Sequence, residues 1–350
     1  EVILGADALE GGGMCKGGMV AGKAHGKGSA TYPNGDFYEG EYIKGKRHGY
    51  GTYTFADGEK YEGEWFQDHQ HGKGTYYFMN NNKYVGLWYK DYQQGHGVMY
   101  YYNGDIYDGA WYEDKRHGKG KYTFASGAWY NGEWKEDQKN GKGTYHWDDG
   151  SIYEGQWQQN MRSGKGIYKY ADGDMYSGQW KEDLQNGKGE YRYANKDIYE
   201  GTYLQGERHG EGVFRYANGD VYIGQFANGE KNGYGTLEWN NGDSYAGYWK
   251  NDKHNGKGKL KKKGGDTFDG TFKDGKMHGE IIIHFSNGIK FKGTYKNGRA
   301  NGKAIEEDKD GKRFEGSYKN GMRDGSYIMK DRNGNVTETG VYKMGVKQKQ

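Results

Sequence analysis

Residues 38–60 read YEGEYIKGKRHGYGTYTFADGEK, and residues 61–83 repeat the pattern as YEGEWFQDHQHGKGTYYFMNNNK. A tyrosine opens each unit, a glycine follows two positions later, and a second ring stands four positions after the first. Steps of 23 residues from Tyr38 meet a tyrosine or phenylalanine every time as far as Phe314, with no insertion or deletion. A fixed period of this length is the signature of a repeat architecture.

The same period sets the limits of the repeated region. A step back from Tyr38 reaches Cys15, so the first unit is degenerate, and after Gly334 the spacing slips by one residue. We therefore expect three segments. They are an N-terminal extension over residues 1–14, about fourteen repeats over residues 15–336, and a frayed partial repeat and tail over residues 337–350. Within the array, the last four repeats are diverged and basic.

Both apolar runs of each unit alternate with period two, which indicates β-strands. In the first unit quoted, the strands would be joined by a polar loop, residues 44–49, and by a turn, residues 56–59. Asn-Gly and Asp-Gly pairs such as Asn34-Gly35 are hairpin connectors that need positive φ. The sequence thus predicts an all-β fold: an elongated single-layer antiparallel meander of 23-residue β-hairpins, a twisted ribbon similar to a solenoid.

The two faces of this sheet differ in chemistry. Tyr38, Gly40 and Tyr42 share one face of their strand, and Glu39 and Glu41 share the other. Glycine in a strand is costly unless something packs over it. We expect rings from neighbouring strands to fill the space over the glycines, so that ring packing replaces an aliphatic core.

Composition supports a folded chain. It holds 36 Tyr, 12 Phe, 10 Trp and 66 Gly but one Pro, whereas disordered segments are poor in aromatic residues. The single cysteine, Cys15, excludes an intrachain disulfide, and no apolar run approaches the roughly 20 residues that cross a bilayer. The formal charge of +3 hides an asymmetry, because residues 251–350 carry 23 Lys and Arg against 13 Asp and Glu. These features favour a soluble, cytoplasmic protein.

The pattern Tyr-x-Gly-x-Trp, followed by Gly-Lys-x-His-Gly-x-Gly-x-Tyr, resembles the MORN repeat (membrane occupation and recognition nexus). The likeness is closest over residues 38–258 and then weakens, since the second-strand glycine becomes Ile281, Ala304 and Tyr327. The resemblance implies a non-enzymatic scaffold of the cytoskeleton, similar to all-MORN cytoskeletal proteins and to radial spoke head components. Its expected location is the ciliary axoneme or a cortical or basal complex, with other cytoskeletal or axonemal proteins as partners.

Some members of this family hold a partner helix in an aromatic groove. The resemblance therefore implies a partner-binding groove along the tryptophan column of the N-terminal half. Its members are Trp65, Trp88, Trp111, Trp134, Trp157 and Trp180.

Two alternatives come from other classes of protein. The family also suggests a phosphoinositide-binding membrane tether, or the regulatory array of a phosphoinositide kinase. The candidate anionic-surface site is Lys259, Lys261, Lys262 and Lys263. Basic and acidic connectors on opposite edges of the sheet also suggest a homo-oligomer of ribbons paired side by side, or merely solvated loops. No nucleic acid partner is expected.

Nothing in the sequence indicates a catalytic, cofactor or metal site. Residues 17–24 resemble a phosphate-binding loop, but Ala24 stands where a hydroxyl is required. Histidines such as His48 recur one repeat apart, about 9.6 Å by strand spacing, which is too far to share a zinc ion. Asn140 and Asn186 occupy the same column, which we interpret as tolerance of left-handed backbone.

Overall fold

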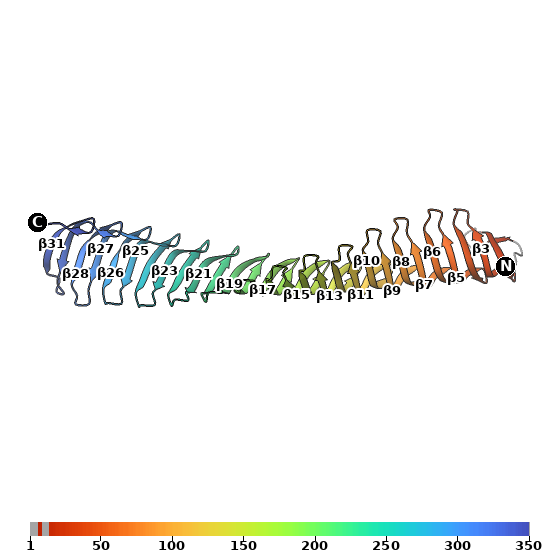
Figure 1. Cartoon of the computed structure of the whole chain (residues 1–350), viewed down its shortest axis with the longest axis horizontal. Coiled ribbons are helices and arrows are strands. Elements are labelled where there is room, and N and C mark those ends of the chain that lie inside the picture. Colours follow the sequence, from red (N-terminus) through yellow and green to blue (C-terminus); the bar gives the residue numbers. More distant parts are fainter. Residues whose placement is uncertain (1–5, 9–13, 350) are drawn as a thin grey trace. The chain divides into compact units, whose positions relative to one another are not determined.

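The computed structural model describes residues 6–8 and 14–349. These residues form strands and turns and no helix, and hence no helix that could cross a membrane. The chain divides into two units, Glu1–Ala171 with Trp180–Asp183 and Asp172–Gln179 with Leu184–Gln350. Within each unit, successive strands pair antiparallel in a single layer (Figure 1). The predicted all-β meander is confirmed.

The strands follow one another in chain order. In the N-terminal unit they are β1 (Ala6–Ala8), β2 (Met14–Val20), β3 (Lys23–Thr31), β4 (Phe37–Ile43), β5 (Lys46–Thr54), β6 (Lys60–Phe66), β7 (His69–Tyr77), β8 (Lys83–Tyr89), β9 (Tyr92–Tyr100), β10 (Ile106–Tyr112), β11 (Lys115–Thr123), β12 (Trp129–Lys135), β13 (Gln138–His146), β14 (Ile152–Gln158) and β15 (Met161–Lys169). The division between the units falls within β16 (Met175–Lys181).

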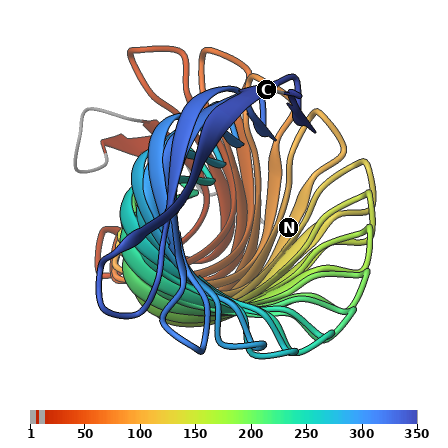
Figure 2. The same ribbon diagram turned by 90° about the vertical axis from the view of Figure 1, so that its left-hand side faces the viewer.

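The C-terminal unit continues the pattern with shorter strands near its end. Its strands are β17 (Leu184–Arg192), β18 (Ile198–Leu204), β19 (Glu207–Arg215), β20 (Val221–Ala227), β21 (Glu230–Glu238), β22 (Ser244–Lys250), β23 (Lys253–Lys261), β24 (Thr267–Lys273), β25 (Lys276–His284), β26 (Lys290–Lys296), β27 (Arg299–Glu307), β28 (Arg313–Lys319), β29 (Met322–Arg323), β30 (Gly325–Lys330), β31 (Val336–Lys343) and β32 (Val346–Lys347). Neighbouring strands within a unit are rotated against one another (Figure 2), as the handed twist of strands requires.

A β-bulge recurs at a constant place in the hairpins that are closed by two-residue turns. In the pair β10–β11, Gly109 faces Gly120 and Trp111 faces Arg116, and the register shifts between these two pairs. Ala110 alone on β10 faces residues 117–119 of β11, so the extra residues of the bulge lie on β11. A bulge disrupts the ladder of main-chain hydrogen bonds locally.

A tyrosine hydroxyl bonds the carbonyl of the residue that lies opposite the bulge. The ring of Tyr107 lies over the Gly109–Gly120 pair, where a Cβ on Gly120 would collide with its hydroxyl. From there the Tyr107 hydroxyl donates a hydrogen bond of 2.8 Å to the main-chain oxygen of Ala110. The same bond recurs in ten successive repeats. The donors are Tyr38, Tyr61, Tyr84, Tyr107, Tyr130, Tyr153, Tyr176, Tyr199, Tyr222 and Tyr245.

The rings interleave edge to face. Tyr107 meets Trp111 of its own strand at 5.1 Å between centroids and Trp134 of the next repeat at 5.5 Å, with interplanar angles of 85° and 89°. Edge-to-face pairs of this kind contribute about 0.5–1.5 kcal/mol beyond the area they bury. Because each tyrosine touches its own repeat and the next, stability within a unit is carried between neighbours.

The connectors differ from the sequence prediction. The expected polar loop, residues 44–49, is mostly strand, and only Lys44 and Gly45 form the turn. Both have positive φ, 49° and 83°, as the two-residue type I′ hairpin turn requires. The Asn-Gly and Asp-Gly pairs lie instead in five-residue loops, where the glycine alone is left-handed, as at Gly35 (φ 94°). Strand pairing extends further along the chain than alternation of apolar residues reveals.

The diverged C-terminal repeats exchange the tyrosine–glycine packing for an aliphatic one. Phe268 replaces the column tyrosine, and Gly270 on its strand faces Ile281 instead of a second glycine. Ile281 and Ile283 are fully buried and head a cluster that includes Phe291 and Ala304. The two replacements belong together, since a branched side chain occupies the space that a tyrosine ring would need.

We predict that Gly120→Ala destabilises the N-terminal unit by roughly 1–3 kcal/mol, the cost of overpacking. The new methyl group would displace Tyr107 and leave the Ala110 carbonyl without its hydrogen bond. Urea unfolding followed by tryptophan fluorescence measures the change. Lys119→Ala, one residue earlier on the exposed face, should alter stability little, and equal effects of the two substitutions would contradict the packing described here.

Candidate partner-binding groove

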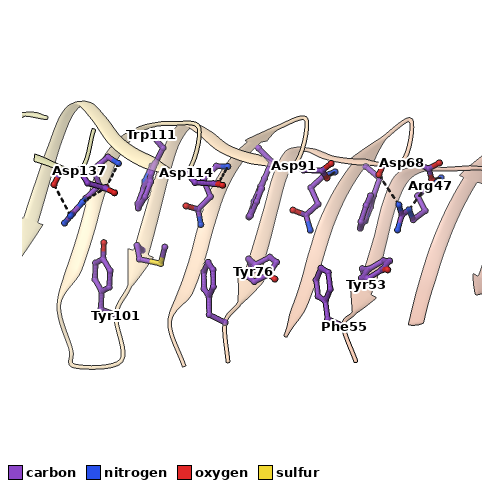
Figure 3. Close-up of a pocket in the computed structure, with 17 residues that line it drawn as sticks. Arg47, Tyr53, Phe55, Asp68, Tyr76, Asp91, Tyr101, Trp111, Asp114 and Asp137 are labelled. Carbon is purple, nitrogen blue, oxygen red and sulfur yellow. Dashed lines mark hydrogen bonds and ion pairs between the residues drawn. The ribbon is translucent and has the colours of Figure 1, made fainter. Parts of the chain in front are cut away.

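The aromatic face of the N-terminal unit carries a groove of about 750 Å³ that crosses several repeats (Figure 3). Its lining comes from β5 to β11, from their connectors and from the turn between β12 and β13. The lining residues are Arg47, Tyr53, Phe55, Trp65, Asp68, Gln70, Tyr76, Phe78, Trp88, Asp91, Gln93, Met99, Tyr101, Trp111, Asp114, Arg116 and Asp137. Figure 3 shows the carboxylates toward one end of the strands and Phe55, Tyr76 and Tyr101 toward the other.

The tryptophans form the floor of the groove. Each indole N–H donates to the main-chain oxygen of a second-strand glycine in the preceding repeat, as from Trp111 to Gly97 at 3.1 Å. Trp65, Trp88 and Trp111 line the groove. Trp134, Trp157 and Trp180 pack in the same way, and none of the six is more than 7% exposed. A partner would therefore meet these rings at their faces and could not reach their N–H groups.

A cation covers the tryptophan at both ends of the groove. The Arg47 guanidinium lies 4.6 Å from the Trp65 ring centroid, and its Nε is 3.1 Å from Oδ1 of Asp68. Its Nη2 also donates to the main-chain oxygen of Asp68. Arg116 repeats this arrangement on Trp134 and Asp137, at 4.7 Å and 3.1 Å. We call this position, between a ring and the turn residue of the next repeat, the cation seat.

Two adjacent cation seats in the groove hold glutamine. Gln70 and Gln93 occupy the column of Arg47 and Arg116, and they are only 6% and 4% exposed. Among the residues that the structure describes, neither side-chain amide has a hydrogen bond. These shorter, neutral side chains leave Trp88 and Trp111 without a covering cation, although both rings stay buried.

The two seats that hold glutamine still have an aspartate in the turn opposite, as the arginine seats do. Asp91 and Asp114 are the second residues of type I′ turns, with φ of 73° and 71°. Each side chain accepts the main-chain N–H of the seat residue, Gln70 or Gln93, at 2.8 Å. Asp91 also pairs with His69 at 2.6 Å. Burial raises the pKa of Asp114 even though the Gln93 N–H bond opposes the shift.

The wall opposite the carboxylates is aromatic except at one position, where a methionine replaces a tyrosine. Tyr53 and Tyr76 donate their hydroxyls to carboxylates of the five-residue loops, Asp36 at 2.6 Å and Glu59 at 2.7 Å. Burial opposes ionisation of Asp36, but the hydrogen bonds from Tyr53 and the Ala56 N–H outweigh it and lower its pKa. In the next repeat Met99 takes the tyrosine position, so the wall is softer and more adaptable there.

The histidine and asparagine column does not have the backbone that the sequence suggested. Asn140 lies within β13, and the left-handed residue is its neighbour Gly141, with φ of 93°. The column instead accepts a main-chain N–H from the turn of the next repeat. His117 Nδ1 receives the Glu136 N–H at 3.4 Å. Within the described ranges, 6–8 and 14–349, no group of His, Cys, Asp and Glu side chains is arranged to hold a metal ion.

The four candidate lysines of the C-terminal unit do not form one cluster. All four are exposed. Lys259 and Lys261 lie on β23, alternating with the inward Leu260, and therefore on the polar face. Lys262 and Lys263 follow in the five-residue loop, where the Lys262 ammonium is 3.3 Å from Asp243.

The seat column also contains a partly buried histidine. His254 stacks on Tyr245 with 3.8 Å between centroids and an interplanar angle of 8°. Burial, aided by the charge of Lys231, lowers its pKa to about 4. His254 also lines a smaller hollow of about 440 Å³ in the C-terminal unit. The histidine is therefore neutral at physiological pH and fills its seat by stacking.

We predict that the C-terminal unit loses stability as pH falls from about 6.5 to about 4. The unfolded chain protonates His254 near pH 6.5, whereas the folded chain resists protonation, so the unfolded state binds more protons in this interval. His254→Gln should remove this part of the pH dependence, since glutamine occupies other seats. Hydrogen exchange of residues 244–261 at pH 7 and pH 4.5 measures it, and an identical pH response in the variant would refute the assignment.

A family model supports the repeat assignment. The MORN repeat model matches fourteen consecutive segments. They are residues 15–37, 38–60, 61–83, 84–106, 107–129, 130–152, 153–175, 176–198, 199–221, 222–244, 245–267, 268–289, 291–313 and 314–336. No curated protein matches the chain.

Solved structures show only a distant likeness. The TCP domain of Drosophila melanogaster SAS-4, in complex with a proline-rich motif of Ana2, is 18% identical, with a TM-score of 0.29 over 44% of this chain and 85% of that one. The Drosophila Sas-4 TCP10c domain is 19% identical, with a TM-score of 0.22 over 50% and 91%. Virginiamycin B lyase from Staphylococcus aureus is 11% identical, with a TM-score of 0.14 over 75% and 91%. Such low TM-scores indicate no function.

Proposed function

Because this chain belongs to the MORN-repeat family, we propose that it is a non-enzymatic scaffold that holds segments of other proteins on its aromatic face. The groove of about 750 Å³ carries this proposal. Its lining combines partly exposed rings, such as Phe55, Tyr76 and Tyr101, with carboxylates. Apolar pockets with a few placed polar groups are the usual sites of ligand and peptide binding.

We further propose that the proteins held are components of the cytoskeleton, in the ciliary axoneme, the radial spoke head or a cortical or basal complex. Family members built almost entirely of repeats serve in such assemblies, and this chain is repeated over nearly its whole length. The proposed binding region is the groove part of the tryptophan column, Trp65 to Trp111.

A groove variant tests the scaffold function. Phe78→Ser with Tyr101→Ser removes two wall rings that are only partly buried, and we expect it to lose cellular partners identified by proximity labelling. The matched control is Tyr100→Ser with Tyr102→Ser, which changes two exposed tyrosines beside Tyr101. Both variants must keep the thermal unfolding of the wild type. An unchanged set of partners in a folded groove variant would rule the proposal out.

A second candidate function is binding to anionic lipid, as in a phosphoinositide-binding tether or the array of a phosphoinositide kinase. It is favoured by the four exposed lysines between Lys259 and Lys263 and by the excess of base in residues 251–350. A basic residue near an anionic surface contributes about 1 kcal/mol. The ion pair of Lys262 with Asp243 reduces what that lysine can contribute.

Liposome flotation decides this second function. If it holds, the chain floats with phosphatidylinositol-phosphate vesicles and not with neutral ones. Replacing all four lysines by serine should then weaken binding by about fivefold per lysine. Serine at Lys73, Lys119, Lys142 and Lys165, four exposed lysines of the N-terminal unit, is the control. Absence of flotation, or equal loss in both variants, would reject a lysine-specific lipid site.

A further inference from the structure

The filled seats show what a cation does on this face. At Arg47, Arg116 and Arg162 the guanidinium lies 4.6 to 4.7 Å from an indole centroid and 3.1 Å from a turn carboxylate. The ring and the carboxylate attract the same positive charge from two sides. Cation–π attraction strengthens when the pair is shielded from water.

The seats of Gln70 and Gln93 keep both halves of this arrangement without the cation. Trp88 and Asp91 frame the first seat, and Trp111 and Asp114 frame the second. We propose, on the basis of the scaffold function, that these two seats receive two basic side chains of the bound partner. The partner supplies the arginines or lysines that the column lacks here.

Comparison with another neutral seat supports this assignment. Gln185 also interrupts the cationic column, but the turn residue opposite is Gly206 and the ring is Tyr203. There the carboxylate is absent together with the cation, so no charge is left to be matched. In the groove the carboxylates persist, and Asp114 has its pKa raised by burial. Asp114 is nevertheless exposed, so an incoming cation can reach its carboxylate.

Charge complementarity thus identifies the partner as basic. Along the groove lie Asp68, Asp91, Asp114 and Asp137, and only the outer two are paired with an arginine of the chain. Asp91 has an exposed histidine as its partner. A partner that buried this wall without bringing positive charge would leave carboxylates desolvated and uncompensated, which is costly.

The spacing of the seats indicates the form of the partner. Adjacent seats are one hairpin apart, which is about 9.6 Å from strand spacing. Residues seven apart on an α-helix are about 10.5 Å apart and lie on the same face. Apolar side chains three and four positions along that helix would then meet Met99 and the ring of Phe78 between the seats. The fitting segment is an amphipathic helix with Arg or Lys at positions i and i+7.

Synthetic helices test this inference on the full chain. The probe is an alanine-based helix with two arginines seven residues apart and leucines at the third and fourth positions between them. The comparison peptide has the same composition with the arginines five residues apart, which places them about 140° apart around the helix. Fluorescence anisotropy should show the first peptide binding at least about tenfold more tightly, as expected for a shielded cation–π contact.

Variants of the chain separate the seats from general charge. The double variant Gln70→Arg with Gln93→Arg places an arginine of the chain itself in each seat, as Arg47 and Arg116 already do on Trp65 and Trp134. It should lower the affinity for the first peptide at least about tenfold. Thr75→Arg with Val98→Arg adds equal charge on the polar face of the same repeats and should change affinity less than about twofold. Asp91→Asn with Asp114→Asn should also weaken binding. The two turns should keep their geometry in this variant, because Asn160 accepts the Lys139 N–H at the equivalent place in another repeat.

Equal binding of the two peptides, unchanged affinity after the seats are filled, or no binding at about 1 mM would each overturn the inference. The cellular assay distinguishes its failure from that of the scaffold function. If partners are lost in the Phe78 and Tyr101 variant but kept when the seats are filled, the scaffold function is supported and the basic-helix inference is rejected. If partners are kept in both variants, both hypotheses are rejected.

Discussion

A tyrosine hydroxyl bonded to the carbonyl opposite the bulge is the contact on which ten of the repeats depend. Tyr107 reaches the Ala110 oxygen only because Gly109 and Gly120 leave room for its ring. The carbonyl of Gly120 in turn accepts the indole N–H of Trp134, whose ring meets the edge of Tyr107. Bulge, glycine pair, tyrosine and tryptophan are therefore one interlocked unit. It explains how a sheet one layer thick is stable without a layer packed over it.

The candidate site arises where the residue in the cation seat changes from arginine to glutamine while the rest of the repeat is kept. Tryptophan occupies the ring column in seven of the fourteen repeats, so a tryptophan column alone does not locate a groove. What differs along the groove is the seat residue, which is Arg47 and Arg116 at its ends and Gln70 and Gln93 inside it. The rings themselves stay equally buried, since the four tryptophans beside these seats are all 5–7% exposed. The change from arginine to glutamine therefore alters the charge of the face at two positions and leaves the fold unchanged.

The ring and glycine columns predicted the strands, the two faces and the packing of rings over the glycines, because period and alternation report directly on which side chains share a face. The connectors were less predictable. The turn at Lys44 and Gly45 and the long strand after it depend on a bulge, which leaves no mark in the alternation. The sequence does show that the residue at this fixed position of the repeat changes from Arg47 to Gln70 and Gln93 and back to Arg116. Its meaning, however, depends on a carboxylate 21 residues away, such as Asp68 for Arg47, and only the folded register brings the two together.

The reciprocal link between seat and turn also governs how such an array can change in length. Asp68 donates its main-chain N–H to the Arg47 oxygen and receives the Arg47 N–H on its side chain. A single residue inserted into a two-residue turn would move the second turn residue and break both bonds. Growth or loss by one whole hairpin preserves them. An array of this kind can therefore change its length without loss of these bonds only in steps of a complete 23-residue repeat.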